Sequence, residues 1–203
     1  MSETSSDSYK TIKVDGTGLF KEKGSKFISY AYMVENETMV KEYLDMLRKK
    51  HFDARHHCYA WVLGTETTNY RANDDGEPSG SAGKPILNQI YSASLTNVLV
   101  VVVRYFGGIK LGVSGLINAY KIASREAISN AEIIELTINH VFYLHFDWPL
   151  MNEVMRVLKE EQIQPEQIAE ENGCIMKLSV RKSSAVNLLN RLSILYGVTI
   201  RAE

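Results

Sequence analysis

Residues 97–128, NVLVVVVRYFGGIKLGVSGLINAYKIASREAI, carry the pattern that decides the fold. They begin with a run of mostly β-branched residues that is apolar on both faces, which predicts a central strand covered on both sides. A glycine-rich turn follows, and beyond it apolar residues recur at helical spacing as far as Asn130. The stretch therefore predicts a buried strand, a tight turn and a long helix in direct succession.

Other elements of the first half follow the same kind of pattern. Residues 27–34 and 56–63 read as strands, and Glu37–Lys50 reads as a helix with Asn36 as its cap. The polar, turn-rich segment 65–84 ends where Pro85 is well placed to open another helix. These patterns predict strands that alternate with helices.

The second half predicts a separate small domain. From residue 135 the apolar patterns run strand, helix, strand, strand, helix, strand within about 70 residues, the order of a ferredoxin-like sandwich. The fold class is therefore α+β. We expect a flexible tail at 1–10, a first domain at 11–134 and a second domain at 135–203.

Composition narrows the classes of function. The chain has 203 residues, 45% of them hydrophobic, and a net charge of −1, so any nucleic-acid binding needs a local basic patch. Cys58 and Cys174 form neither a disulfide framework nor a CxxC metal motif, which favours a reducing cytoplasm. The start of the chain lacks an apolar signal core, and the longest apolar run is too short for a bilayer, so we expect no membrane partner.

The glycine turn resembles a phosphate-binding loop only in part. A P-loop needs a lysine after its last glycine, whereas Lys110 precedes Gly112, and the dinucleotide pattern GxGxxG is absent. Two interpretations stay open. The glycines let backbone N–H groups approach an anion at a helix start, or they only permit positive φ angles and tight packing. The bare sequence favours the second.

Two further stretches contain residues of catalytic or metal-binding type. Asp74, Asp75 and Glu77 suit either Mg²⁺ or an ordinary turn, and the turn is favoured because the EF-hand spacing is missing. His56 and Cys58 share one face of a strand, where they suit either a nucleophile pair or an inert core thiol; the core thiol is favoured. We therefore predict no catalytic residue, no metal and no cofactor.

Three stretches together make the chain resemble the IMPACT/YigZ family: ARHHCYAWVLG (54–64), DDGEPSGSAGKPIL (74–87) and LTNVLVVVVRYFGGIKLGVSGLINAYKIASREAI (95–128). The length and the second half resemble the bacterial two-domain members. Ser114 and Asn118 depart from the glycine and arginine that are usual in the family, which leaves the start of the helix less cationic.

The resemblance implies a fold and a setting. The first domain would resemble domain IV of elongation factor G, an α/β sandwich in which helices pack on a mixed sheet. The second would resemble the ferredoxin-like domain V of the same factor. The eukaryotic relative acts in translation stress by contacting a scaffold protein and restraining the activation of an initiation-factor kinase, and the bacterial members have been proposed to bind nucleic acid or the ribosome.

We therefore expect a translation-associated regulatory protein that binds RNA, the ribosome or a translation-stress partner without catalysis. Its patch would hold phosphates without reading bases, so it would not be a DNA sequence reader. The alternatives are an adaptor that binds protein alone, and a small-molecule hydrolase or transferase with a pocket between the DDGEPSG and FGGIKLG loops. The patch combines cations with glycine amides: Arg55, Arg71, Lys84, Arg104, Gly107, Gly108, Lys110 and Gly112.

Overall fold

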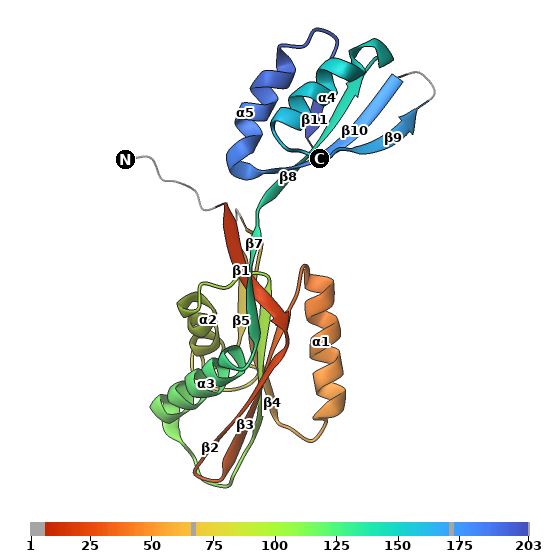
Figure 1. Cartoon of the computed structure of the whole chain (residues 1–203). Helices are drawn as coiled ribbons and strands as arrows, with labels where there is room; N and C mark the ends of the chain where they lie inside the picture. Colours follow the sequence, from red (N-terminus) through yellow and green to blue (C-terminus); the bar gives the residue numbers. More distant parts are fainter. Residues whose placement is uncertain (1–6, 66–67, 171–172, 203) are drawn as a thin grey trace. The chain divides into compact units, whose positions relative to one another are not determined.

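The computed structural model describes residues 7–65, 68–170 and 173–202 (Figure 1). These residues form two compact units, one of residues 9–136 and one of residues 137–202 together with Asp7 and Ser8. Residues 1–6 of the expected tail lie outside the described residues. Residues 8–10, also expected in the tail, instead belong to strand β1, Ser8–Val14.

A five-stranded sheet with the order β2-β3-β6-β4-β5 forms the centre of the first unit. The apolar run of the sequence is the middle strand, as predicted, and all but its last residue are buried. The strands are β2 (Gly16–Glu22), β3 (Ser25–Met33), β4 (His56–Leu63), β5 (Asn69–Asn73) and β6 (Val98–Tyr105).

The expectation of a mixed sheet is wrong, because all four pairings in this sheet are antiparallel. The reason is where the strands insert. β3 and β4 run parallel to each other, as a strand–helix–strand crossover requires, but β6 lies between them in the opposite direction. In the same way β4 lies between the parallel strands β5 and β6. Each crossover is split by a strand of the other.

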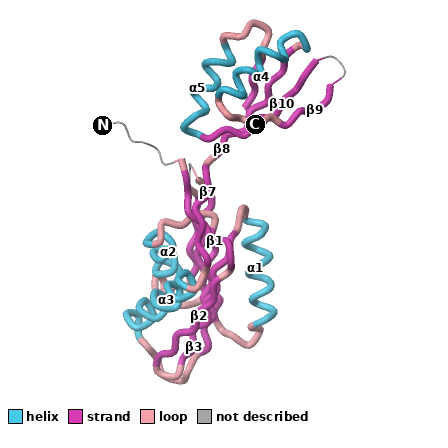
Figure 2. The backbone as a smooth tube through the Cα atoms, viewed as in Figure 1, coloured by secondary structure: helices cyan, strands magenta, loops and turns pink. Residues whose placement is uncertain are grey.

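The helices cover the sheet on both faces (Figure 2). Helix α1 (Glu37–Lys50) packs against one face, where odd-numbered residues of β4 and β6 form an aromatic and aliphatic core. Helices α2 (Gly83–Ser92) and α3 (Gly112–Ser129) pack against the other face, where the even-numbered residues lie. Alternation along a strand thus decides which layer each side chain enters.

The predicted limits of helix α1 and the predicted end of helix α3 are confirmed. Helix α1 spans the predicted residues, and the side chain of Asn36 accepts a hydrogen bond from the N–H of Met39 at 3.0 Å, as an N-cap does. Helix α3 ends at Ser129, and Asn130 is its C-cap. The sequence did not reveal β1, β2 or β7 (Glu132–Thr137).

Strands β1 and β7 form a separate two-stranded sheet. Lys13 of β1 and Glu132 of β7 form an exposed ion pair at 2.8 Å. Lys10 also forms an isolated parallel bridge with Leu95. These contacts tie both ends of the first unit's chain to one place.

The second unit confirms the predicted order of elements, strand, helix, strand, strand, helix, strand. Its sheet has the order β11-β8-β10-β9, with antiparallel neighbours throughout. The class of the protein is thus α+β. The elements are β8 (Asn139–Phe146), the short 3-10 helix η1 (Trp148–Leu150), α4 (Met151–Glu160), β9 (Glu166–Glu170), β10 (Gly173–Arg181), α5 (Lys182–Ser193) and β11 (Thr199–Ala202).

The first turn of helix α5 is capped by Asp7, a residue far away in the sequence. The N–H of Ser183 donates to Oδ1 of Asp7 at 2.7 Å, and the hydroxyl of Ser183 also bonds Asp7. The carboxylate thus takes the place of a local cap.

Within the described residues, no helix has the length and apolar character that crossing a membrane requires.

Candidate anion-binding site

A cavity of about 450 Å³ lies on the α2/α3 side of the first unit, where the loop after β5 meets the loop after β6. Both loops were singled out in the sequence, and the cavity lies between them as the small-molecule alternative requires. The start of β4, the end of β6 and the start of α3 supply the rest of its wall. It is lined by Arg55, His56, Glu77, Pro78, Arg104, Phe106, Lys110, Leu111, Gly112, Val113 and Leu116.

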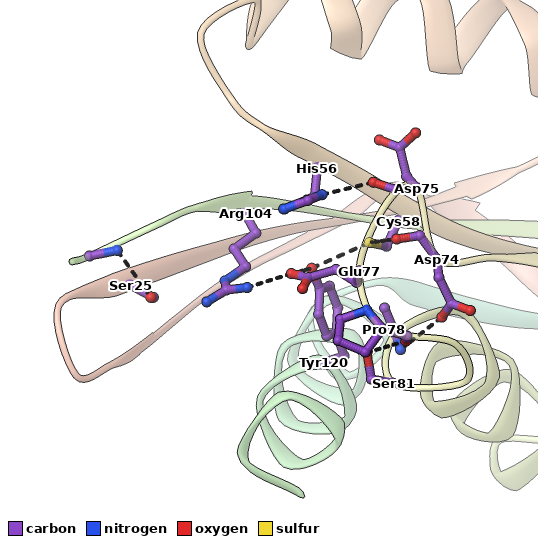
Figure 3. Close-up of polar contacts among 12 residues, drawn as sticks. Ser25, His56, Cys58, Asp74, Asp75, Glu77, Pro78, Ser81, Arg104 and Tyr120 are labelled. Atoms are coloured by element: carbon purple, nitrogen blue, oxygen red, sulfur yellow. Dashed lines mark hydrogen bonds and ion pairs between the residues drawn. The ribbon is translucent and has the colours of Figure 1, made fainter. Parts of the chain in front are cut away.

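The centre of this wall is a buried ion pair between Arg104 and Glu77 (Figure 3). The Arg104 guanidinium donates to Oε1 of Glu77 at 2.6 Å, and the side chains are 7% and 3% exposed. The hydroxyl of Tyr120, from α3, donates to the same carboxylate oxygen at 2.8 Å. A buried charge needs such partners, because its desolvation is otherwise very costly.

Arg104 keeps capacity for another acceptor. One of its terminal nitrogens is directed at Glu77, and the other points away from it (Figure 3). Its Nε is buried and has no hydrogen-bond partner among the described residues. The guanidinium also lies over the rings of Phe27 and Phe106, at 5.4 and 5.6 Å from their centroids. Its position is therefore fixed while part of its donor set is unused.

The start of helix α3 faces the same cavity. The helix begins at Gly112, and the residue before it, Leu111, forms no side-chain capping bond. The first-turn N–H groups of an α-helix lack intrahelical partners and carry partial positive charge. Lys110 and Arg55 add exposed cations at the rim. The arrangement suits an anion.

Two acids of the DDGEP stretch hold its loop together. The Asp74 carboxylate accepts hydrogen bonds from the N–H groups of Gly80, Ala82 and Gly83 at 2.8 to 3.0 Å. Asp75 accepts from the N–H of His57 at 2.6 Å. These bonds support the turn interpretation. In the described parts of the chain, no three His, Cys, Asp or Glu residues are grouped closely enough to hold a metal.

The thiol of Cys58 is arranged as a core group. It donates to the carbonyl oxygen of Asp74 at 3.0 Å and lies 3.3 Å from the hydroxyl of Tyr120, and burial strongly raises its pKa. His56 shares its face of the strand, as predicted, but the His56 ring bonds the carbonyl oxygen of Asp75 at 2.8 Å. A thiol with a raised pKa is a poor nucleophile, since the thiolate is the reactive form.

Geometry accounts for the glycines of the turn. A Cβ on Gly107 would lie 1.9 Å from the carbonyl carbon of Gly24, and its N–H already donates to Oγ of Ser25 at 3.1 Å. Gly108 and Gly112 have φ angles of 87° and 73°, which favour glycine. Of these three predicted site glycines, Gly112 lines the cavity and the other two shape the loop.

The structure gathers only part of the predicted patch. Arg55, Arg104, Lys110 and Gly112 line one cavity. Arg71 pairs in register with Trp61 and lines a different cavity beside α1. Lys84 lines a third, between α2 and α3. The odd–even alternation of the strands explains Arg71, because its position opposite Trp61 places it on the α1 side.

Sequence reasoning singled out His56 and Glu77, but it missed Glu77 as the partner of Arg104 and Tyr120 as the donor beside that pair. It also gave no role to the wall residues Pro78 and Phe106. One signal was available. Arg104 continues the even-numbered series Val98, Val100, Val102, all buried, so a cation in that series requires a buried carboxylate.

The Impact N-terminal domain family matches residues 23–128, just over half of the chain and the whole of the cavity wall. The chain belongs to the IMPACT family. The IMPACT family member YvyE of Bacillus subtilis is 36% identical over 155 residues, which cover 76% of this chain and 71% of that protein. YigZ of Escherichia coli is 43% identical over 100 residues, about half of each chain, 48% and 49%.

Solved structures extend the likeness beyond the family domain. A crystal structure described as a hypothetical protein matches 98% of both chains with a TM-score of 0.73 and 25% sequence identity. The two-domain translational regulator Yih1 matches 59% of this chain and 48% of its own, with 24% identity. Its TM-score of 0.39 is too low to carry an argument.

Proposed function

We propose that this IMPACT family member is a translation-associated regulatory protein that acts in the cytoplasm by binding RNA or the ribosome, without catalysing a reaction. One observation carries the proposal. Arg55, Arg104 and Lys110 converge with the uncapped start of α3 on a single cavity. Cations and helix N-termini are the groups that proteins use to hold phosphates.

The local charge supports a phosphate ligand despite the overall charge of −1. Among the described residues that line the cavity, Glu77 is the one carboxylate, and Arg104 and Tyr120 already engage it. The cations at the rim, Arg55 and Lys110, are exposed, so a ligand can reach them. Binding that neutralises phosphates releases counterions, so it weakens steeply as salt rises.

The translation setting comes from the family. Membership of the IMPACT family supports a role like the one that the resemblance implies, regulation by contact in the translation apparatus. The non-catalytic part of the proposal is supported by the chemistry of Cys58, whose pKa is raised by burial, and by His56, whose ring is engaged by a backbone carbonyl. Neither is poised as a nucleophile or its base.

Co-sedimentation with ribosomes tests the proposal. The wild-type protein should sediment with ribosomes at low salt and be released by high salt or by nuclease, because phosphate contacts are screened or removed. Lys110→Ala should sediment several-fold less. Lys49→Ala is the matched control, since it removes the same charge from α1, on the opposite face of the sheet. Sedimentation equal in all three proteins would contradict the proposal.

A protein-binding adaptor without RNA contact is a second candidate, and one observation favours it. Three large apolar side chains are exposed around the turn and the start of α3, Phe106, Ile109 and Val113, at 49 to 58% of their surface. Grouped exposed apolar residues are typical of protein contacts. A partner that stays bound in nuclease-treated lysate, and is lost on Ile109→Ser, would select this function over RNA binding.

A further inference from the structure

We propose that the cavity binds a nucleoside 5′-monophosphate, either free or as the 5′-phosphorylated end of a single-stranded RNA; this deepens the proposed function and rests on it. The phosphate lies between the start of α3 and Arg104. The base lies against the apolar part of the wall. Four properties of the cavity lead to this ligand: its charge, its unused donors, its apolar surface and its size.

The charge of the wall matches a phosphate monoester. The lining includes three cationic side chains, Arg55, Arg104 and Lys110, and one carboxylate, Glu77. The net charge is thus about +2 at neutral pH. A terminal phosphate monoester carries about −1.5 to −2 at pH 7, whereas each diester phosphate within a strand carries about −1. A ligand with a terminal phosphate therefore neutralises the site more completely than an internal stretch of backbone.

The donors are in place to receive that phosphate. Arg104 is 6% exposed, its Nε lacks a partner among the described residues, and one terminal nitrogen points away from Glu77 (Figure 3). The first turn of α3 begins at the cavity with Gly112 and Val113. A buried, fixed guanidinium and a helix start on the same cavity are two separate anion-binding features.

The remaining wall is apolar. Beside the charged groups, the cavity is lined by Pro78, Phe106, Leu111, Val113 and Leu116. Phe106 is 49% exposed, so one part of its ring is free to contact a ligand. An inorganic phosphate would leave this surface unused. A nucleobase has a flat face that stacks on aromatic side chains without regard to base identity.

The volume limits the ligand to a single nucleotide. About 450 Å³ lies at the small end of the range of about 300–1,000 Å³ that is usual for small-molecule sites. A duplex, with phosphates spread over both strands, would contact the rim without filling the cavity. The site is therefore specific for one terminal or free nucleotide, and its contacts require no particular base.

Isothermal titration calorimetry of the full chain tests the ligand class. The probes are AMP, adenosine, inorganic phosphate and a phosphoserine peptide. AMP should bind at least about tenfold tighter than adenosine, phosphate or the peptide, because only AMP offers both the dianion and the base. Equal binding of AMP and adenosine, tighter binding of the phosphoserine peptide, or no heat with AMP at millimolar concentration would overturn the proposal.

Variants assign the binding to this cavity. Lys110→Ala and Arg55→Ala change exposed residues, so folding is not at risk, and each should weaken AMP binding by about three- to tenfold. Phe106→Ala should reduce the preference of the site for AMP over inorganic phosphate. Lys49→Ala should bind AMP as the wild type does. The proposal would be overturned if Lys49→Ala lost AMP binding. It would also be overturned if Lys110→Ala and Arg55→Ala bound AMP as tightly as the wild type and Phe106→Ala kept the wild-type preference for AMP over phosphate.

A comparison of two RNAs distinguishes a free nucleotide from an RNA end as the ligand, and it separates this inference from the proposed function. A single-stranded RNA with a 5′-phosphate should bind at least about fivefold tighter than the same RNA with a 5′-hydroxyl if the natural ligand is an RNA end; equal binding of the two RNAs, with AMP still bound, identifies the free nucleotide. Sedimentation with ribosomes could depend on Lys110 while AMP does not bind and the 5′-phosphate does not change RNA affinity. The inference of a terminal phosphate would then fail, and the proposed function would stand.

Discussion

The guanidinium of Arg104 and the carboxylate of Glu77 meet at 2.6 Å, each almost wholly buried. Arg104 lies next to the last residue of the central strand β6, and Glu77 belongs to the loop that precedes α2. Tyr120 of α3 donates to the same carboxylate. One acid thus joins a strand, a loop and a helix, and it fixes the cation around which the cavity is built.

Removing Glu77 should destabilise the first unit. Glu77→Ala leaves the Arg104 charge buried without its partner, which costs about 3–5 kcal/mol. The double variant Glu77→Leu with Arg104→Met replaces the pair by apolar groups of similar volume and should be more stable than Glu77→Ala alone. Urea unfolding measures both. A double variant no more stable than the single one would contradict this view of the pair.

Asp74 should control the order of the loop that leads into α2. Asp74→Ala removes the acceptor of three backbone N–H groups, those of Gly80, Ala82 and Gly83, and should cost about 3 kcal/mol. Asp74→Asn keeps one acceptor oxygen and should cost less. Hydrogen exchange at the three amides is the direct measurement. Unchanged protection of all three in Asp74→Ala would show that another group holds the loop.

Gly107 should be required for the stability of the turn and not for binding a ligand. Gly107→Ala places a Cβ against the backbone of Gly24 and Ser25 and should cost at least about 2 kcal/mol. Gly115→Ala is the control, since this glycine lies inside α3, where alanine is favoured by up to about 1 kcal/mol. Its added Cβ would make a close contact of 3.1 Å with the Cβ of Leu111, which offsets part of that gain but is far milder than the 1.9 Å clash at Gly107. Thermal unfolding compares them. Wild-type stability of Gly107→Ala together with lost RNA binding would instead assign this glycine to the ligand.

Two buried histidines on the α1 side should make stability fall in mild acid. Burial lowers the pKa of His51 and of His57 below the ordinary value of 6.5. Below about pH 6.5 the unfolded chain therefore binds protons that the folded chain does not. The contribution of these histidines to the free energy of unfolding is fully present above about pH 6.5 and is lost as the pH falls through their lower folded pKa values.

The histidine effect can be measured by urea unfolding between pH 8 and pH 5, compared with His57→Asn. The variant should show a shallower loss of stability with falling pH than the wild type, whatever its stability at pH 8. His51 remains in both proteins, where its ring bonds the hydroxyls of Tyr30 and Tyr105 at 2.7 and 2.9 Å. An equal or steeper loss in the variant would exclude His57 as a source of the effect.

Cys58 and Cys174 should be nearly inert in the folded protein. Both are buried, and burial raises the pKa of each thiol. Alkylation of Cys58 at pH 8 should be more than about 100-fold slower than in denaturant, because each unit by which the pKa rises removes about nine-tenths of the thiolate. Alkylation of Cys174 should also be slower in the folded protein, because burial raises its pKa as well. Mass spectrometry of tryptic peptides resolves the two sites. Fast native alkylation of Cys58 would reopen the nucleophile interpretation.

The sequence predicted those parts of the fold that depend on local pattern. The run at β6, the periodicity of α1 with Asn36 as its cap, and the element order of the second unit all arise from neighbours in the chain. It did not predict that every pairing in the five-stranded sheet is antiparallel. That property depends on which strand inserts between which, and inserted strands come from distant parts of the chain.

The candidate site divides in the same way. Arg104, Lys110 and Gly112 lie within nine consecutive residues, and β4 brings Arg55 beside them, since His56 pairs with Arg104 in register. Arg71 faces the other layer because the pleat alternates. The Glu77 partner was missed because the DDGEP stretch also fits an ordinary turn. Only the structure shows which of its acids reaches into the core.

The binding of single-stranded RNA as a function of salt tests the central claim, that cations on this cavity hold phosphate, most directly. Fluorescence titration between about 50 and 200 mM salt should show a steep fall in affinity for the wild type, and Lys110→Ala should bind more weakly with a log–log salt slope smaller by about 0.7. Lys49→Ala should match the wild type. Undetectable binding, salt-insensitive binding, or equal slopes and affinities for all three proteins would contradict the account.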